Sequence, residues 1–140
     1  MRVVKATGVS DSTCSFVLPY GSTINMDGTA IYQALAAVFL ANAFGIQLGF
    51  GHYVLIGVTA LLASIGTAGV PGAGLIMLSM VLASVGIPIE GIALIAGVDR
   101  IMDMPRTAVN IVDDSTAAVL IAKTEGEALP DDLLAAGAGS

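Results

Sequence analysis

Charge is scarce in this 140-residue sequence, and the scarcity argues against an ordinary soluble domain. Asp, Glu, Lys and Arg make up only 11% of the residues, whereas a typical soluble domain contains about 25%. No charged residue occurs at positions 28 to 89, a run of 62 residues. A charge-free stretch of this length is typical of protein in a lipid bilayer. The chain also has no basic patch, so we expect no nucleic-acid partner.

Cysteine, histidine and tryptophan are rare or missing, which limits the possible chemistry. Cys14 is the only cysteine, so no disulfide can form within the chain. His52 is the only histidine, and it falls in an expected outer loop, away from the polar motifs. An intramembrane serine protease, with Ser64 as its nucleophile, is the alternative from another class, but it needs a base within reach of the serine. We therefore expect no enzyme.

Three apolar segments lie between polar ends, and they predict an all-α membrane protein. We expect a polar N-terminal segment at 1–14, a broken transmembrane helix at 15–48, a re-entrant hairpin at 53–89, a transmembrane helix at 90–124 and a partly disordered tail at 125–140.

The hairpin prediction depends on helix length. The apolar arms at 53–63 and 75–85 contain 11 residues each, or about 16 Å at 1.5 Å per residue, and neither spans a hydrocarbon core of about 30 Å. Between them lies the Gly- and Pro-rich stretch SIGTAGVPGAG at 64–74. One kinked span followed by a surface loop is the alternative. Glycine and proline both weaken a helix interior, which favours the hairpin.

Basic residues predict the orientation. Arg2, Lys5 and Lys123 lie at the two ends of the apolar region, and the intervening loops carry no Lys or Arg. The positive-inside rule then places both termini in the cytoplasm of a plasma or inner membrane, with the hairpin open to the outside.

Segment 90–124 carries a polar stripe. At 100° per residue, five polar side chains fall within an arc of about 80° on one helix face: Asp99, Asp103, Arg106, Asn110 and Asp114. An internal ion-pair network that only packs this helix is one interpretation. Acids outnumber bases in the stripe, so at least one carboxylate is not paired with a base and can bind a cation or an ammonium group.

The first apolar segment contains a second polar group. Asn25, Asp27 and Thr29 supply oxygen atoms, while Gly21 and Gly28 loosen the helix. A helix start capped by Asp27 is the alternative. Helix breaks at membrane depth can offer N–H groups to an anion and carbonyl groups to a cation. The pattern therefore favours an ion-coupled carrier of a small charged solute.

Three motifs make the prediction more specific: NMDGT at 25–29, SIGTAGVPGAG at 64–74 and DMPRTAVN at 103–110. In order and spacing they resemble the glutamate/aspartate transporter family, the dicarboxylate/amino acid:cation symporters. The resemblance covers roughly residues 8 to 126. It implies cation-coupled uptake of aspartate or glutamate, with the hairpin as an extracellular gate.

The resemblance also implies substrate-binding residues. Arg106 would pair with the side-chain carboxylate of the substrate, Asp103 with its ammonium group, and Asn110 with its main-chain carboxylate. Thr29 would hydrogen-bond the substrate. The other implied substrate contacts are Val70, Gly74 and Thr107.

The cation sites follow from the same resemblance. Asp114, with Gly21, Asn25 and Asn110, matches one sodium site. A second comprises Thr23, Met26, Ser64, Ile65 and Thr67. Asn25 and Asp27 belong to a third site, which the family completes from an earlier helix.

Departures from the family pattern leave alternatives open. Asp113 stands where many relatives have a small residue, and a second carboxylate beside Asp114 favours proton involvement. The alternative to sodium-coupled uptake is therefore a proton-coupled carrier of glutamate or of C4-dicarboxylates. The family has further N-terminal segments, including a serine-rich hairpin, so we expect the chain to be the C-terminal part of a longer, homotrimeric protein. A fragment that does not transport is the other interpretation.

Overall fold

The computed structural model of the protein describes residues 1–65, 67, 73–127 and 129, and within these residues the regular structure is entirely helical. The all-α prediction is therefore confirmed for this part of the chain. The helices in chain order are α1 (Arg2–Ala6), α2 (Asp11–Ile24), α3 (Asp27–Ala43), α4 (Phe50–Ile65), α5 (Ala73–Ser84), the 3₁₀ turn η1 (Ile89–Gly91), α6 (Ile92–Ala96) and α7 (Asp99–Thr124).

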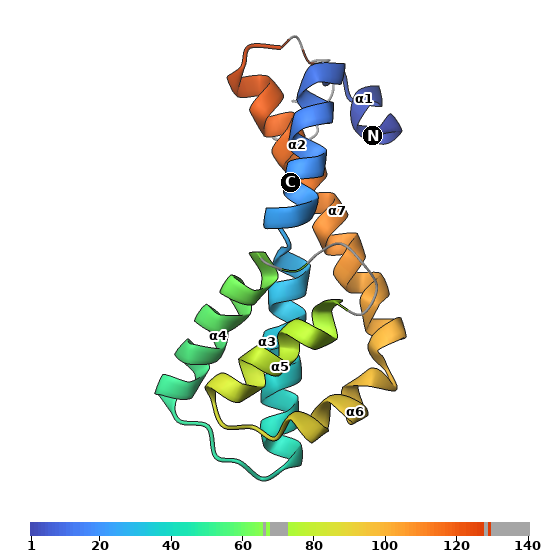
Figure 1. Ribbon diagram of the computed structural model, residues 1–140. Helices are drawn as coiled ribbons and strands as arrows, with labels where there is room; N and C mark the ends of the chain where they lie inside the picture. Colours follow the sequence, from blue (N-terminus) through green and yellow to red (C-terminus); the bar gives the residue numbers. More distant parts are fainter. Residues whose placement is uncertain (66, 68–72, 128, 130–140) are drawn as a thin grey trace, which may run out of the picture.

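The helices pack around one long axis. α2 and α3 follow one another along that axis, and α7 returns beside α2 toward the end where α1 lies (Figure 1). α4 and α5 contact each other and both pack against α3, which also contacts α7. α3 therefore connects α4 and α5, the two arms, to α7.

The chain between α2 and α3 is not helical. Asn25 (φ −114°, ψ 69°) and Met26 (φ −110°, ψ 60°) leave the helical region. The Asn25 amide closes α2 on the carbonyl of Gly21, and α3 begins with the amides of Thr29 and Ala30 on the Met26 carbonyl. The first amides of α3, including that of Gly28, are left without partners in their own helix and must find them elsewhere.

The chain at 90–124 differs from the single helix predicted from its sequence. It contains part of η1, the five-residue α6, and then α7 after Gly97 and Val98. The amide of Val98 bonds to the carbonyl of Ile95, a tighter turn than that of an α-helix. Gly91 lies against Phe44 and Leu40, where a Cβ would come within 2.7 Å and 2.9 Å of their side chains. This close packing holds η1 against the end of α3.

The N-terminal residues also contain more structure than their polarity suggests. α1 precedes α2, which begins at Asp11, four residues before the predicted segment. Ser10 is the N-cap of α2, and its hydroxyl accepts from the amide of Thr13. Val4 and Val9 are buried in this region.

Two apolar clusters form the interior. The larger joins α3, α4, α5 and α6 around Leu40, Ile56, Leu78 and Leu82. The smaller joins α2 and α7, and its buried members are Val4, Val9, Cys14, Val17, Ala118 and Ala122. Between the two clusters lie the polar residues of the predicted site.

By length and composition, one stretch among the described residues is apolar enough to cross a membrane, Asp11–Ala43, which includes the break at Asn25 and Met26. α4 and α5 are apolar but shorter, at 16 and 12 residues. α7 is 26 residues long and carries the charged stripe.

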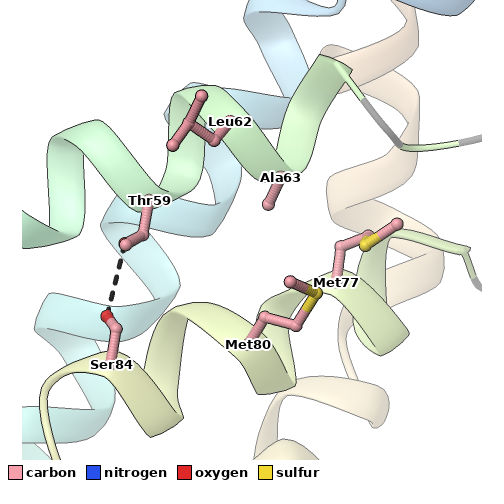
Figure 2. A pocket seen from close by; sticks show the side chains of 6 residues that line it. All are labelled: Thr59, Leu62, Ala63, Met77, Met80 and Ser84. Atoms are coloured by element: carbon pink, nitrogen blue, oxygen red, sulfur yellow. Dashed lines mark hydrogen bonds between the residues drawn. The ribbon is translucent and has the colours of Figure 1, made fainter.

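An apolar cavity of about 430 Å³ lies between α4 and α5. Its lining residues are Thr59, Leu62 and Ala63 from α4 and Met77, Met80 and Ser84 from α5 (Figure 2). At one end, the hydroxyls of Thr59 and Ser84 are 3.3 Å apart and form a hydrogen bond between the arms.

Candidate substrate and cation site

Arg106 of α7 is held between two acids and an aromatic ring. Its Nη2 donates to Asp103 Oδ1, one turn earlier on the helix, and its Nη1 is 4.0 Å from Asp99 Oδ1. The guanidinium carbon is 4.8 Å from the ring centroid of Tyr32 on α3, a cation–π distance. Tyr32 in turn donates its hydroxyl to Asp99 Oδ1 at 2.7 Å. A buried cation is therefore balanced by nearby negative charge.

The guanidinium of Arg106 also lies against the start of α5. A Cβ on Gly74 would overlap Nη1 of Arg106, so glycine at this position lets the α5 backbone approach. The Arg106 side chain is 9% exposed. Its Nη1 is buried and has no hydrogen-bond partner among the described residues, which leaves donor capacity for an incoming acceptor. The predicted contact Val70 lies outside the described residues.

Asn110 connects α7 to the start of α3. The Gly28 amide donates to Asn110 Oδ1 at 2.8 Å, and Asn110 Nδ2 donates to Thr29 Oγ1 at 3.3 Å. A Cβ on Gly28 would overlap the backbone carbonyl oxygen of Arg106 and come within 3.1 Å of Val109 Cβ. Glycine is thus required for this approach of α3 to α7.

Asp114 lies one turn beyond Asn110 and faces the end of α2. Asn25 Nδ2 donates to Asp114 Oδ1 at 3.3 Å, and a Cβ on Gly21 would overlap the Asp114 carboxylate. Three of the four residues of the first predicted cation site, Gly21, Asn25 and Asp114, are therefore adjacent. Among the described residues no three His, Cys, Asp or Glu side chains gather as metal ligands. Asp114 itself supplies carboxylate oxygen atoms, the ligand type that suits a hard cation, and Asn25 presents its amide nitrogen to this carboxylate.

The remaining predicted cation residues are positioned less tightly. Ser64 and Thr67 are buried, but their hydroxyls donate to backbone carbonyls of α4, at Leu61 and Ala63. The exposed Thr23 likewise donates to Tyr20 of its own helix.

Four further predicted residues show no side-chain hydrogen bond to any described residue. Met26 lies partly buried at the α2–α3 break, and Ile65, at the end of α4, is 46% exposed. Asp27 and Thr107 are exposed.

Three residues in or near this site were not among the predicted binding residues. Tyr32 and Asp99 enclose Arg106, as described above. Gln33, on α3, is fully buried, and neither polar atom of its side chain has a hydrogen-bond partner among the described residues. The sequence contained a signal for two of them, because Asp99 lies on the polar stripe and Gln33 is a polar residue within a charge-free run.

The polar contacts together form a line where α2 and α3 meet α7. We call this line the seam, defined by the contacts of Gly21, Asn25, Gly28 and Thr29 with Asn110 and Asp114.

Comparison with known proteins identifies the family. Residues 1–124 match the profile of the Sodium:dicarboxylate symporter family. The chain is 44% identical over 127 residues to a proton/sodium-glutamate symport protein of Geobacillus stearothermophilus, covering 91% of this chain and 30% of the relative. It is 47% identical over 122 residues to a proton/glutamate-aspartate symporter of Escherichia coli, covering 87% of this chain and 28% of the relative. It is 49% identical over 114 residues to excitatory amino acid transporter 1 of Homo sapiens, covering 81% of this chain and 21% of the relative.

These matches define the class as transporters of the symporter type, which are not enzymes. The chain belongs to the sodium:dicarboxylate symporter family. Membership implies a membrane location. The chain spans less than a third of the length of the relatives described here.

Proposed function

We propose that the chain forms the substrate- and cation-binding part of a carrier that couples the uptake of L-aspartate or L-glutamate to sodium entry. Arg106 binds the side-chain carboxylate of the substrate, Asp103 its ammonium group and Asn110 its main-chain carboxylate. Thr29, Gly74 and Thr107 are the other proposed contacts within the described residues, and Val70 is a further proposed contact.

The observation that supports the proposal most directly is the hydrogen bonding of the Arg106 guanidinium. A guanidinium binds a carboxylate with two parallel hydrogen bonds. Nη1 of Arg106 lacks a hydrogen-bond partner among the described residues, and Nη2 is bonded to Asp103. An arriving substrate carboxylate can accept from both nitrogens and release Asp103. The released carboxylate is then available to the ammonium group of the same substrate.

The coupled cation is proposed to bind beside Asp114. Its carboxylate lies against Gly21 and the side-chain amide of Asn25, and a sodium ion there would be bound by this carboxylate together with carbonyl oxygen atoms of Gly21, Asn25 and Asn110. Thr23, Met26, Ser64, Ile65 and Thr67 form the second proposed cation site, and Asn25 with Asp27 part of a third. Binding at these positions links α2, α4 and α7.

The membrane arrangement is part of the proposal. α4 and α5 are the arms of a re-entrant hairpin that opens outward and closes over the substrate, and both termini lie in the cytoplasm. Further N-terminal segments complete the substrate site, and the complete carrier is a homotrimer.

The test is uptake by the protein encoded by the open reading frame that contains this chain. The protein would be reconstituted in liposomes and given radiolabelled aspartate under an inward sodium gradient. Arg106→Cys should reduce uptake of aspartate and glutamate at least about a hundredfold, because a bidentate charge-assisted contact is lost. Arg100→Cys is the matched control, since Arg100 lies on the same helix and is exposed. Unchanged aspartate affinity in Arg106→Cys would refute the substrate assignment.

Sodium and proton coupling are separated in the same liposomes. Replacing external sodium with choline, with no pH difference across the membrane, should abolish uptake by the wild-type protein. Uptake driven by a proton gradient in the absence of sodium would instead establish the proton-coupled alternative.

A further inference from the structure

A carboxylate outside the predicted site connects the two ends of the described chain. Glu127, just after α7, accepts three hydrogen bonds from the start of α2. The Ser10 amide donates to Oε2 at 2.8 Å, the Ser10 hydroxyl donates to Oε1 at 2.6 Å, and the Thr13 hydroxyl also donates to Oε1. We call Ser10, Thr13 and Glu127 the carboxylate clamp.

Two glycines with positive φ bring the members of the clamp together. Gly126 (φ 75°) ends α7, and the amide of Glu127 then bonds back to the Ala122 carbonyl, the pattern of a Schellman cap. Gly8 (φ 87°) ends α1 just before Ser10, the N-cap of α2. The C-terminal end of α7 is thereby placed against the N-terminal end of α2.

The charge of Glu127 suits this position. Its carboxylate lies at the N-terminus of a 14-residue helix, where the helix dipole favours a negative charge. Hydrogen bonds from the Ser10 and Thr13 hydroxyls and the Ser10 amide lower the pKa of Glu127 below its usual range. The clamp therefore contains an ionised acceptor at neutral pH.

The contacts between α2 and α7 run in antiparallel order from the clamp to the seam. After the clamp, Cys14 and Val17 share a buried cluster with Ala118 and Ala122. Next along the pair, Gly21 and Asn25 meet Asp114. The clamp and the proposed cation site are thus the two polar ends of one helix pair, visible as neighbouring ribbons in Figure 1.

The middle of this helix pair specifies its register less strictly than hydrogen bonds would. Apolar packing is not directional, and the two small alanines on α7 present little shape to resist a slide along the helix axis. The hydrogen bonds of the clamp are directional. A shift of α7 relative to α2 would separate Glu127 from its donors and Asp114 from Asn25 at the same time.

We propose that Glu127 is a positioning residue for cation coupling: the carboxylate clamp sets the register of α2 and α7 and thereby the position of Asp114 against Gly21 and Asn25. This inference rests on the proposed function, since it assigns the clamp to the cation site of the same carrier. It predicts that the clamp controls the cation dependence of transport more than the affinity for the amino acid.

The test measures two constants in liposomes for the protein encoded by the complete open reading frame. Glu127→Gln should raise the sodium concentration for half-maximal uptake about threefold to tenfold, a factor that corresponds to the net contribution of a hydrogen bond. The KM for aspartate at saturating sodium should change less than about twofold. Glu125→Gln is the matched control, because Glu125 is exposed and makes no side-chain hydrogen bond among the described residues. It should leave both constants unchanged.

Two further variants keep the proposal testable if Glu127→Gln fails to reach the membrane. Thr13→Val removes one donor and keeps the side-chain shape, and Gly126→Ala keeps the carboxylate but strains the turn that positions it. Both should raise the sodium requirement. Normal sodium dependence in every clamp variant that is made, with active wild-type protein, would overturn the clamp proposal alone. A wild-type protein without sodium-dependent uptake of acidic amino acids would overturn the proposed function, and the clamp proposal with it.

Discussion

The seam and the two arms α4 and α5 are built in different ways. Along the seam, side chains of α7 bond to another helix, as Asn110 does to Gly28 and Thr29. In the arms, the described hydroxyls bond mostly to their own backbone, as Ser64 does to Leu61 and Ser79 to Ile76. Directional bonds specify one arrangement, whereas apolar contacts between smooth helices permit small displacements at low cost. This difference is consistent with the proposed roles of the seam as the binding site and of the arms as the gate that closes over it.

The largest expected difference comes from adding one methyl group to each region. Gly28→Ala on the seam should destabilise the protein by about 3 kcal/mol, because the new Cβ overlaps the carbonyl oxygen of Arg106 and the backbone there cannot easily yield. A Cβ added by Gly57→Ala in α4 would meet no atom of the described residues within 4 Å, so this change should stabilise its helix by about 0.5–1 kcal/mol. Thermal melting of the purified variants in detergent measures both. Equal melting temperatures would remove the distinction between the seam and the arms.

A smaller effect is expected from removing one charge on the seam. Asp114→Asn keeps the side-chain shape and should raise the sodium concentration for half-maximal uptake at least about tenfold. Asp113→Asn is the control, since Asp113 makes no side-chain hydrogen bond to any described residue, and its sodium dependence should stay within about twofold of wild type. Radiotracer uptake against sodium concentration tests the pair. A larger effect from Asp113→Asn would move the proposed site to the neighbouring position on α7.

The smallest effect is expected in the arms themselves. Thr59→Val removes the hydroxyl that bonds to Ser84 across the cavity of Figure 2 and should cost less than about 0.5 kcal/mol, because the Thr59 hydroxyl also bonds to its own helix. Thr116→Val on α7 is the matched change, because among the described residues the Thr116 hydroxyl bonds only to a backbone carbonyl of its own helix, that of Val112. Melting temperatures that differ by several degrees between these two variants would show that the link between the arms matters.

Much of the helical arrangement followed from the sequence, because local rules govern it. Asp103 and Arg106 are three residues apart, so any α-helix brings them together. The charge-free run with its central Gly and Pro residues predicted two short apolar helices, and these correspond to α4 and α5 with ends shifted by a few residues.

Long-range contacts were less accessible from the sequence. The hydrogen bond between Asn25 and Asp114 joins residues 89 positions apart, and the first cation site could be suggested only through family resemblance. Tyr32 beneath Arg106 depends on how α3 faces α7, which periodicity alone does not specify. The break at Gly97 and Val98 was not predicted, because an isolated glycine is tolerated inside a helical pattern.

Gly74 bears on how fast the Arg106 side chain can move. The backbone of α5 at Gly74 lies directly against Nη1 of Arg106. The guanidinium therefore cannot rotate toward α5 while α5 stays in place. Exposed side chains change rotamer within about picoseconds to nanoseconds, but helical elements move within about microseconds to milliseconds. Under the proposed function, we therefore expect the slower displacement of α5 to limit the rate at which Arg106 exchanges Asp103 for a substrate carboxylate.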